Sequence, residues 1–168
     1  MSKSEWTDRA ASIRAIIVDV DGVLTDGGLY YFAENQVAVR FHVRDGLGIR
    51  LAQRAGMLIG LISGRDIPEV RRRAEELDFD EIHLGVQEKA PVIEDLLARR
   101  KLRPEEVCFI GDDVIDIPAM HAVGLSVAVG DAHPAVRRIA SWTTTAKGGE
   151  GAVRETIDMI IAAREESS

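Results

Sequence analysis

The sequence predicts an α/β fold with a doubly wound parallel sheet, and two observations lead to that prediction. Short apolar runs alternate along the chain with segments of helical periodicity. This alternation is typical of parallel strands joined by right-handed helical crossovers. The chain has 168 residues, 46% of them hydrophobic and 29% charged, which suits one globular domain over residues 1–168 with one hydrophobic core.

Five apolar runs are the predicted strands of this sheet, and five segments with helical spacing are the predicted helices. The strands are expected over residues 13–19, 57–63, 82–84, 107–110 and 125–129. The helices are expected over residues 45–55, 66–77, 89–100, 114–122 and 152–164. Doubly wound folds place functional groups at the carboxyl ends of their strands, so the residues that follow each predicted strand are the candidate functional residues.

One segment breaks the alternation of strands and helices. Residues 28–32 and 36–43 are rich in β-forming residues, and Glu34-Asn35 is a turn between them. The pattern predicts a β-hairpin over about residues 28–43, inserted after the first strand. Its edges are exposed in an isolated chain, so we expect the hairpin to act as a lid or to contact another subunit.

Charge and hydropathy exclude several classes of protein. The 28 acidic side chains outnumber the 21 basic ones, giving a net charge of −7 that disfavours a general nucleic-acid binder. No apolar run approaches the roughly 18 residues that a bilayer crossing needs, so no membrane contact is expected. Residues 1–11 lack the apolar segment of a signal peptide, and the single Cys108 is expected in the core. We therefore expect a cytoplasmic protein.

Two carboxylates, Asp19 and Asp21, follow the first predicted strand and precede Gly22. One interpretation is an ordinary acidic turn. A calcium loop is a second interpretation, but its spacing fails because the glycine is the fourth residue of the motif rather than the sixth. The third interpretation is a nucleophilic aspartate that attacks a phosphoryl group, with the second carboxyl as proton donor and a divalent cation to neutralise charge.

The ends of later strands carry groups that such phosphoryl transfer needs. A serine hydroxyl with nearby backbone N–H groups suits a phosphoryl oxygen, a lysine supplies a point charge, and an acidic cluster suits Mg²⁺. In chain order these groups are Ser63-Gly64-Arg65, Lys89, and Asp112, Asp113 and Asp116. Each group alone is a weak signal. Their joint occurrence in this order favours a phosphoryl-transfer site.

These motifs resemble those of the haloacid-dehalogenase-like (HAD) phosphohydrolases. The matching stretches are Asp19-Val20-Asp21-Gly22-Val23, Ser63-Gly64-Arg65, Lys89 and Gly111-Asp112-Asp113-Val114-Ile115-Asp116. Within that superfamily the chain is similar to the 3-deoxy-D-manno-octulosonate 8-phosphate (KDO 8-phosphate) phosphatase family, over about residues 13–164. Supporting stretches are residues 24–27, 43–50, 123–129 and 151–155. The resemblance implies a Rossmann-like HAD fold with a β-hairpin flap and no large cap domain.

The resemblance also implies roles for single residues. Asp19 corresponds to the nucleophile and a Mg²⁺ ligand, and Asp21 to the general acid–base, which lends the metal its backbone carbonyl. Asp112 corresponds to the third metal ligand, while Asp113 and Asp116 correspond to residues that orient their neighbours. Ser63 and Lys89 correspond to the residues that hold the phosphoryl group. The implied substrate contacts are Asp21, His42, Val43, Arg44, Asp45, Gly46, Arg50, Gly64, Arg65, Arg73 and Lys89.

The implied reaction is Mg²⁺-dependent hydrolysis of KDO 8-phosphate through an aspartyl-phosphate, in lipopolysaccharide precursor synthesis. The implied assembly is a homotetramer joined through the 28–43 hairpin, in which a neighbour helps to cover each site. The tail, residues 146–168, begins with a glycine-rich stretch over 146–151 that is expected to be flexible and to reach a neighbouring site.

Three positions bear on which member of the family this chain resembles. His42 replaces an Asn of many relatives, and Glu150 replaces an Arg of some. Arg65 stands where the phosphatases of nine-carbon KDN 9-phosphate tend to carry Glu, which favours the eight-carbon sugar acid. The alternatives are a phosphatase for KDN 9-phosphate or N-acetylneuraminate 9-phosphate, a non-catalytic partner domain of a sugar-nucleotide synthetase, and a receiver-type signalling module. In receivers the acidic pair precedes the acceptor Asp, the reverse of the order here.

Overall fold

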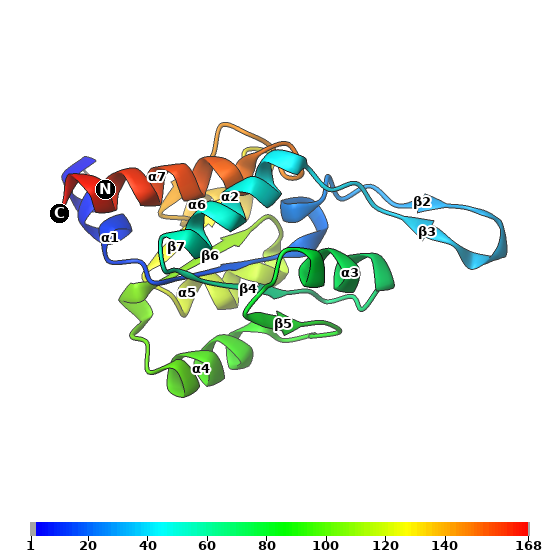
Figure 1. Ribbon diagram of the computed structural model, residues 1–168, viewed down its shortest axis with the longest axis horizontal. Coiled ribbons are helices and arrows are strands. Elements are labelled where there is room, and N and C mark those ends of the chain that lie inside the picture. Colours follow the sequence, from blue (N-terminus) through cyan, green and yellow to red (C-terminus); the bar gives the residue numbers. More distant parts are fainter. Residues whose placement is uncertain (1–2, 168) are drawn as a thin grey trace.

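Six parallel strands form one sheet in the order β5-β4-β1-β6-β7-β8 (Figure 1). The computed structural model describes residues 3–167. The strands are β1 (Ala15–Val18), β4 (Leu58–Ile62), β5 (Glu81–His83), β6 (Val107–Gly111), β7 (Leu125–Ala128) and β8 (Trp142–Thr143). All four residues of β1 are buried, because helices cover the sheet on both faces and the strand therefore reads as a continuous apolar run. The predicted α/β sheet is confirmed.

Helices cover both faces of the sheet (Figure 1). They are α1 (Lys3–Ala11), α2 (Val43–Arg54), α3 (Pro68–Glu76), α4 (Lys89–Arg100), α5 (Ile117–His121), α6 (Pro134–Ile139) and α7 (Ala152–Glu166). Helices α1, α2 and α7 pack together, and α4 packs on α5. Among residues 3–167, none of the helices combines the length and the apolar character that a bilayer crossing requires.

Three short elements were not predicted from the sequence, namely α1, α6 and β8. Helix α1 is largely polar, and it is held by Ala10, which is buried, and by Trp6, whose ring stacks on Trp142 of β8 at 5.8 Å between centroids. Because α1 buries only one aromatic and one small residue, its sequence shows no helical periodicity of apolar residues.

The predicted helix over residues 114–122 is divided in the structure into a 3₁₀ turn at Val114–Asp116 and the helix α5. The division follows from Asp116, whose side chain turns inward to bind backbone N–H groups.

The predicted hairpin is present but its ladder is shorter than expected. Strands β2 (Tyr30–Tyr31) and β3 (Val37–Ala38) pair antiparallel, and the hairpin extends away from the rest of the chain (Figure 1). A bridge between Thr25 and Phe41 closes its base. Aromatic side chains lie exposed along it, with Tyr31 at 73% and Phe32 at 60% of full exposure.

Cys108 lies in the core, as predicted. The residue is fully buried in β6, and burial raises the pKa of its thiol. A thiol in such surroundings stays protonated and unreactive.

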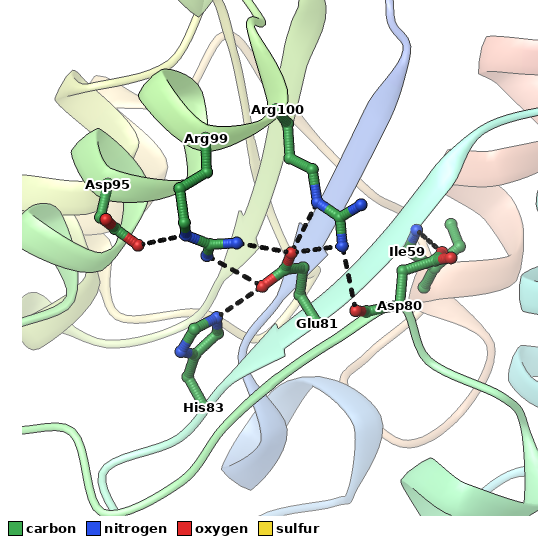
Figure 2. A network of polar contacts seen from close by, with 7 residues as sticks. All are labelled: Ile59, Asp80, Glu81, His83, Asp95, Arg99 and Arg100. Carbon is green, nitrogen blue, oxygen red and sulfur yellow. Dashed lines mark hydrogen bonds and ion pairs between the residues drawn. The ribbon is translucent and has the colours of Figure 1, made fainter.

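A charged network joins β5 to the end of α4 (Figure 2). Glu81 accepts hydrogen bonds from Arg99, with Nη1 at 3.1 Å and Nη2 at 3.0 Å, and from Arg100 Nε at 2.7 Å. His83 Nε2 lies 3.1 Å from the same carboxylate. Arg99, followed by Arg100 and His83, lowers the pKa of Glu81 from 4.5 to about 2, although burial opposes the shift.

Glu81→Gln is expected to lower the free energy of unfolding at pH 7 by about 1–3 kcal/mol, because two arginines lose a buried carboxylate. A carboxyl whose pKa is lowered by folding stabilises the protein above its unfolded pKa and loses that contribution as pH falls. The difference between wild type and variant should therefore be constant above about pH 5 and shrink from pH 4.5 towards pH 2. Urea unfolding at several pH values measures it. A difference that stays constant down to pH 3 would contradict the assignment.

Candidate active site

The groups singled out at the strand ends meet at the carboxyl edge of the sheet. Asp19 directly follows β1, Ser63 follows β4, and Asp112 follows β6, and these three strands are neighbours in the sheet. Lys89 is the first residue of α4. Parallel strands bring their carboxyl ends to one edge, so residues far apart in sequence come together there.

Lys89 joins two buried carboxylates at the centre of the site. Its Nζ donates to Asp19 Oδ1 and to Asp116 Oδ1, each at 2.6 Å. The three side chains are 1%, 6% and 0% exposed, in that order. Burial alone would lower the pKa of Lys89, but the charges of Asp19 and Asp116 outweigh it and raise that pKa. The amine is therefore a fixed positive charge with one N–H left for a further acceptor.

Asp116 is fully engaged by the protein. Its Oδ1 accepts from Lys89, and its Oδ2 accepts from the backbone N–H of Asp112 at 2.9 Å and of Asp113 at 3.2 Å. Both oxygens thus hold neighbouring groups in place. This geometry agrees with an orienting role rather than direct metal ligation.

The acidic cluster fits a divalent cation. Asp19, Asp112 and Asp116 each place one carboxylate oxygen within 4.8 Å of the others, and since both Asp116 oxygens are engaged by the protein, Asp19 and Asp112 are the two side chains that can hold the ion. Burial, followed by the charges of Asp19 and Asp116, raises the pKa of Asp112 to about 8. Burial, and after it Asp116, raises the pKa of Asp19 to about 6, although Lys89 opposes the shift. So much uncompensated negative charge is typical of a site that binds a cation.

The Asp112 side chain occupies the space that a side chain at position 22 would need, so this position requires glycine. A side chain at this position would collide with the Asp112 carboxylate, and φ of Gly22 is +86°, a value that favours glycine. Thr25 fixes the same loop, because its Oγ1 accepts from the backbone N–H of Gly22 at 3.3 Å and of Gly27 at 3.2 Å. Thr25 was not singled out from the sequence as a site residue. A threonine two residues before a glycine in a turn was the available signal.

Asp21 carries a buried oxygen without a hydrogen-bond partner among the described residues. That atom is Oδ1, and the nearest cation is Arg65, whose Nη1 lies 3.5 Å away. An unsatisfied carboxylate oxygen is costly in a purely structural role and useful in a group that exchanges a proton with substrate. Asp21 and Arg65 also line the same cavity.

That cavity has a volume of about 220 Å³ and is lined by charged and glycine residues with one apolar side chain. Its walls are Asp19, Asp21, Gly64, Arg65, Asp112, Asp113 and Ile115. Ser63 precedes the lining residue Gly64 and is itself 1% exposed, and its Oγ accepts from Arg65 N at 3.1 Å. The cavity therefore combines a candidate nucleophile, a candidate proton donor, a cation site and a guanidinium.

Known proteins share both the sequence and the fold. Residues 82–157 match the family model of haloacid dehalogenase-like hydrolases. The 3-deoxy-D-manno-octulosonate 8-phosphate phosphatase of Yersinia pestis is 43% identical over 157 residues, which are 94% of this chain and 84% of that protein. The chain belongs to the KDO 8-phosphate phosphatase family. It is accordingly a phosphatase.

Two solved structures of the family carry ligands. The phosphatase of Moraxella catarrhalis, in complex with magnesium, phosphate and KDO, is 32% identical, covers 98% of this chain and 95% of its own, and has a TM-score of 0.95. The cobalt-bound phosphatase of Haemophilus influenzae is 42% identical, covers 95% of this chain and 93% of its own, and has a TM-score of 0.90.

Apart from Lys89, the implied substrate contacts that do not line the Asp19 cavity lie just before α2, on α2 and on α3, and they are His42, Val43, Arg44, Asp45, Gly46, Arg50 and Arg73. Val43 and Arg73 line a second cavity of about 300 Å³, whose other walls are Val39, Phe41, Glu69, Arg72 and Glu76. Arg73 lies over the Phe41 ring, 5.8 Å from its centroid. The two cavities share no lining residue. A contact between this second group and the substrate stays a prediction.

Other members of that group have partners within the chain. Arg50 donates to Asp78 Oδ2 at 2.5 Å and to the Glu76 carbonyl at 2.6 Å. His42 precedes α2, and its Nδ1 accepts from the Arg44 backbone N–H at 3.2 Å. Gly46 is buried in α2, and the Arg44 side chain is exposed. Asp45 is buried, with contacts to the start of α7.

Proposed function

We propose that this phosphatase hydrolyses KDO 8-phosphate to KDO and inorganic phosphate, with Mg²⁺ as cofactor, in the cytoplasm as a step of lipopolysaccharide precursor synthesis. The observation that carries the proposal is the shared cavity, in which Asp19, held by Lys89, lies beside Asp21, Asp112 and Arg65. A sugar-acid phosphate carries a phosphate and a carboxylate, and the cavity offers a cation site for the first and a guanidinium for the second. The Moraxella relative, which binds magnesium, phosphate and KDO, supports this choice.

The proposed reaction runs in two displacements at phosphorus. An Asp19 oxygen attacks the phosphoryl group while Asp21 donates its proton to the departing sugar oxygen, which leaves an aspartyl-phosphate. Asp21, now ionised, takes a proton from a water that attacks the same phosphorus, and phosphate leaves as Asp19 is restored. Lys89 directs its free N–H, and Ser63 its hydroxyl, to the phosphoryl oxygens. A divalent cation held by Asp19, Asp112 and the Asp21 carbonyl would neutralise the charge that nucleophile and phosphate bring together.

A phosphate-release panel tests the substrate. Wild-type protein is assayed with KDO 8-phosphate, KDN 9-phosphate, N-acetylneuraminate 9-phosphate and hexose phosphates, with Mg²⁺ and after EDTA treatment. We expect the highest kcat/KM for KDO 8-phosphate, loss of turnover in EDTA, and recovery on adding Mg²⁺. A higher kcat/KM for a nine-carbon acid would replace the proposed substrate, and full activity in EDTA would contradict the metal requirement.

Arg65→Ala is expected to lower kcat/KM for KDO 8-phosphate by roughly 10–100-fold, the value of one charged hydrogen-bonded contact. For p-nitrophenyl phosphate, which has no carboxylate, the loss should stay within about 3-fold. Arg65→Lys keeps the charge without the planar fork and should lie between wild type and Arg65→Ala. Equal losses on both substrates would mean that Arg65 does not bind the sugar acid.

We also propose a homotetramer joined through the hairpin. The exposed Tyr30, Tyr31 and Phe32 support it, because monomers seldom leave such a run of aromatic side chains in water. The position of Val43 and Arg73 outside the Asp19 cavity fits contacts made to a neighbour's substrate. Light scattering of wild type should give four times the chain mass of 18.4 kDa. Tyr31→Glu combined with Phe32→Glu should give a smaller species, and an unchanged mass would exclude the hairpin as the contact.

A further inference from the structure

Residues 146–151, here called the backing loop, pack against the loop that carries the nucleophile. Sequence composition predicts a flexible segment, and within the chain this segment makes ordered contacts of its own; its contact with a neighbouring site stays a prediction. Gly149 N donates to the Val23 carbonyl at 2.9 Å. Gly148 and Gly149 are buried, and a side chain on Gly148 would collide with the carbonyl of Gly22. The backing loop therefore lies in direct contact with the glycine that makes room for Asp112.

Hydrogen bonds to carboxylates outside the backing loop hold the loop and its two flanks in place. Asp45, in the first turn of α2, accepts from the backbone N–H of Gly151 at 3.3 Å and of Arg154 at 2.8 Å. Asp131 accepts from Gly148 N at 3.0 Å. On the α7 side, Glu155 accepts from the backbone N–H of Thr145 and Ala146, at 2.9 and 2.8 Å.

Asp45 differs from the other carboxylates because it couples α2 to the backing loop. It is 1% exposed, and each of its two oxygens accepts from one backbone N–H. Both carboxylate oxygens are therefore occupied by the protein's own backbone. Resemblance to the family had implied a substrate contact at this position, whereas the geometry gives the side chain a different partner.

The hairpin base reaches the same loop through Arg40. Its Nη2 donates to the Gly149 carbonyl at 3.3 Å, and its Nη1 donates to Asp26 Oδ2 at 3.3 Å. Glu150 Oε1 lies 4.0 Å from the same guanidinium. Arg40 is half exposed, so water screens its ion pairs. The buried Asp45 is therefore expected to contribute more than Arg40 to holding the backing loop.

We propose that Asp45 is a positioning residue for catalysis: by fixing the backing loop it holds Gly22, and with it the loop bearing Asp19 and Asp21, in the reactive arrangement. The proposal rests on the phosphatase activity and not on which sugar phosphate is the substrate. Loss of Asp45 should release the backing loop and let the loop at Gly22 shift. Small displacements of reacting groups cost roughly 10–100-fold in rate, so the effect belongs in kcat.

The test compares kcat and KM for two substrates, KDO 8-phosphate and p-nitrophenyl phosphate. Asp45→Ala should lower kcat about 10–100-fold for both, with KM changed less than about 3-fold. Asp45→Asn keeps one acceptor oxygen and should recover much of that loss. Gly148→Ala should reproduce the fall in kcat without touching α2. Asp158→Ala is the matched control, because Asp158 binds the Arg154 side chain on the exposed face of α7 and should leave both constants unchanged.

Two results would overturn the proposal. A rise in KM for KDO 8-phosphate alone, with p-nitrophenyl phosphate hydrolysed normally, would make Asp45 a substrate contact. Wild-type kinetics of both single variants, Asp45→Ala and Gly148→Ala, would remove the backing loop from catalysis, and Gly148→Ala decides the matter if Asp45→Ala fails to fold. If wild type hydrolyses p-nitrophenyl phosphate but not KDO 8-phosphate, the proposed substrate is wrong and the aryl ester still tests Asp45.

Discussion

Asp19→Asn is expected to lower kcat by about 10⁴-fold or more, because an amide cannot attack phosphorus and no aspartyl-phosphate forms. The variant should keep its fold. Its amide oxygen can still accept the 2.6 Å hydrogen bond from Lys89. The substitution also removes the negative charge of Asp19, which is, after burial, the largest cause of the raised pKa of Asp112. Repulsion between like charges in the site therefore decreases. Phosphate release measures the activity, and thermal unfolding by circular dichroism checks the fold.

The matched control is Asp95→Asn, which makes the same chemical change at an exposed residue. Asp95 lies on α4 and pairs with Arg99. It should leave kcat within about 2-fold of wild type. Turnover by Asp19→Asn at more than a few per cent of wild type, in protein free of deamidated material, would refute the nucleophile assignment. A large loss in Asp95→Asn would point instead to a general loss of native structure.

The sequence was most informative where burial is uniform. Strands β1, β4, β6 and β7 lie inside the sheet, so each is a short apolar run that periodicity detects. The elements that escaped prediction are short and contribute few buried side chains. Strand β8 has two residues at the sheet edge, and α1 is held by contacts with α7 and by the stacking of Trp6 on Trp142. Such contacts exist only in three dimensions.

The residues of the site also fall into a group that the sequence predicts and a group that it does not. Asp19, Ser63 and Asp112 were predictable because each follows a strand, and parallel strands bring these positions together without further information. The environment of Asp45 was not predictable, because its partner Gly151 lies 106 residues away. The local sequence around Asp45 is compatible with a substrate contact or with a buried anchor. Only the packing of α2 on α7 separates the two.

Lys89→Met should be the most destabilising of these substitutions, since it leaves Asp19 and Asp116 buried without their cation. Removing one partner of a buried ion pair costs about 3–5 kcal/mol. Lys101→Met, at an exposed lysine just beyond α4, should cost less than about 0.5 kcal/mol and serves as the control. Activity should also fall, by about 10²–10³-fold, because a positioned charge on the phosphoryl group is lost. Urea unfolding and phosphate release measure the two effects.

A second substitution separates charge from packing. If the instability of Lys89→Met comes from uncompensated carboxylates, adding Asp116→Asn should restore part of it, and the two changes will couple by at least about 1 kcal/mol. Asp116→Asn alone should be destabilising, since Oδ1 and Oδ2 hold Lys89 and two backbone N–H groups. Additive losses in the double variant would mean that Lys89 stabilises the site by packing alone. In that case its 2.6 Å contacts would give no net electrostatic stabilisation, and its positive charge would serve the phosphoryl group alone.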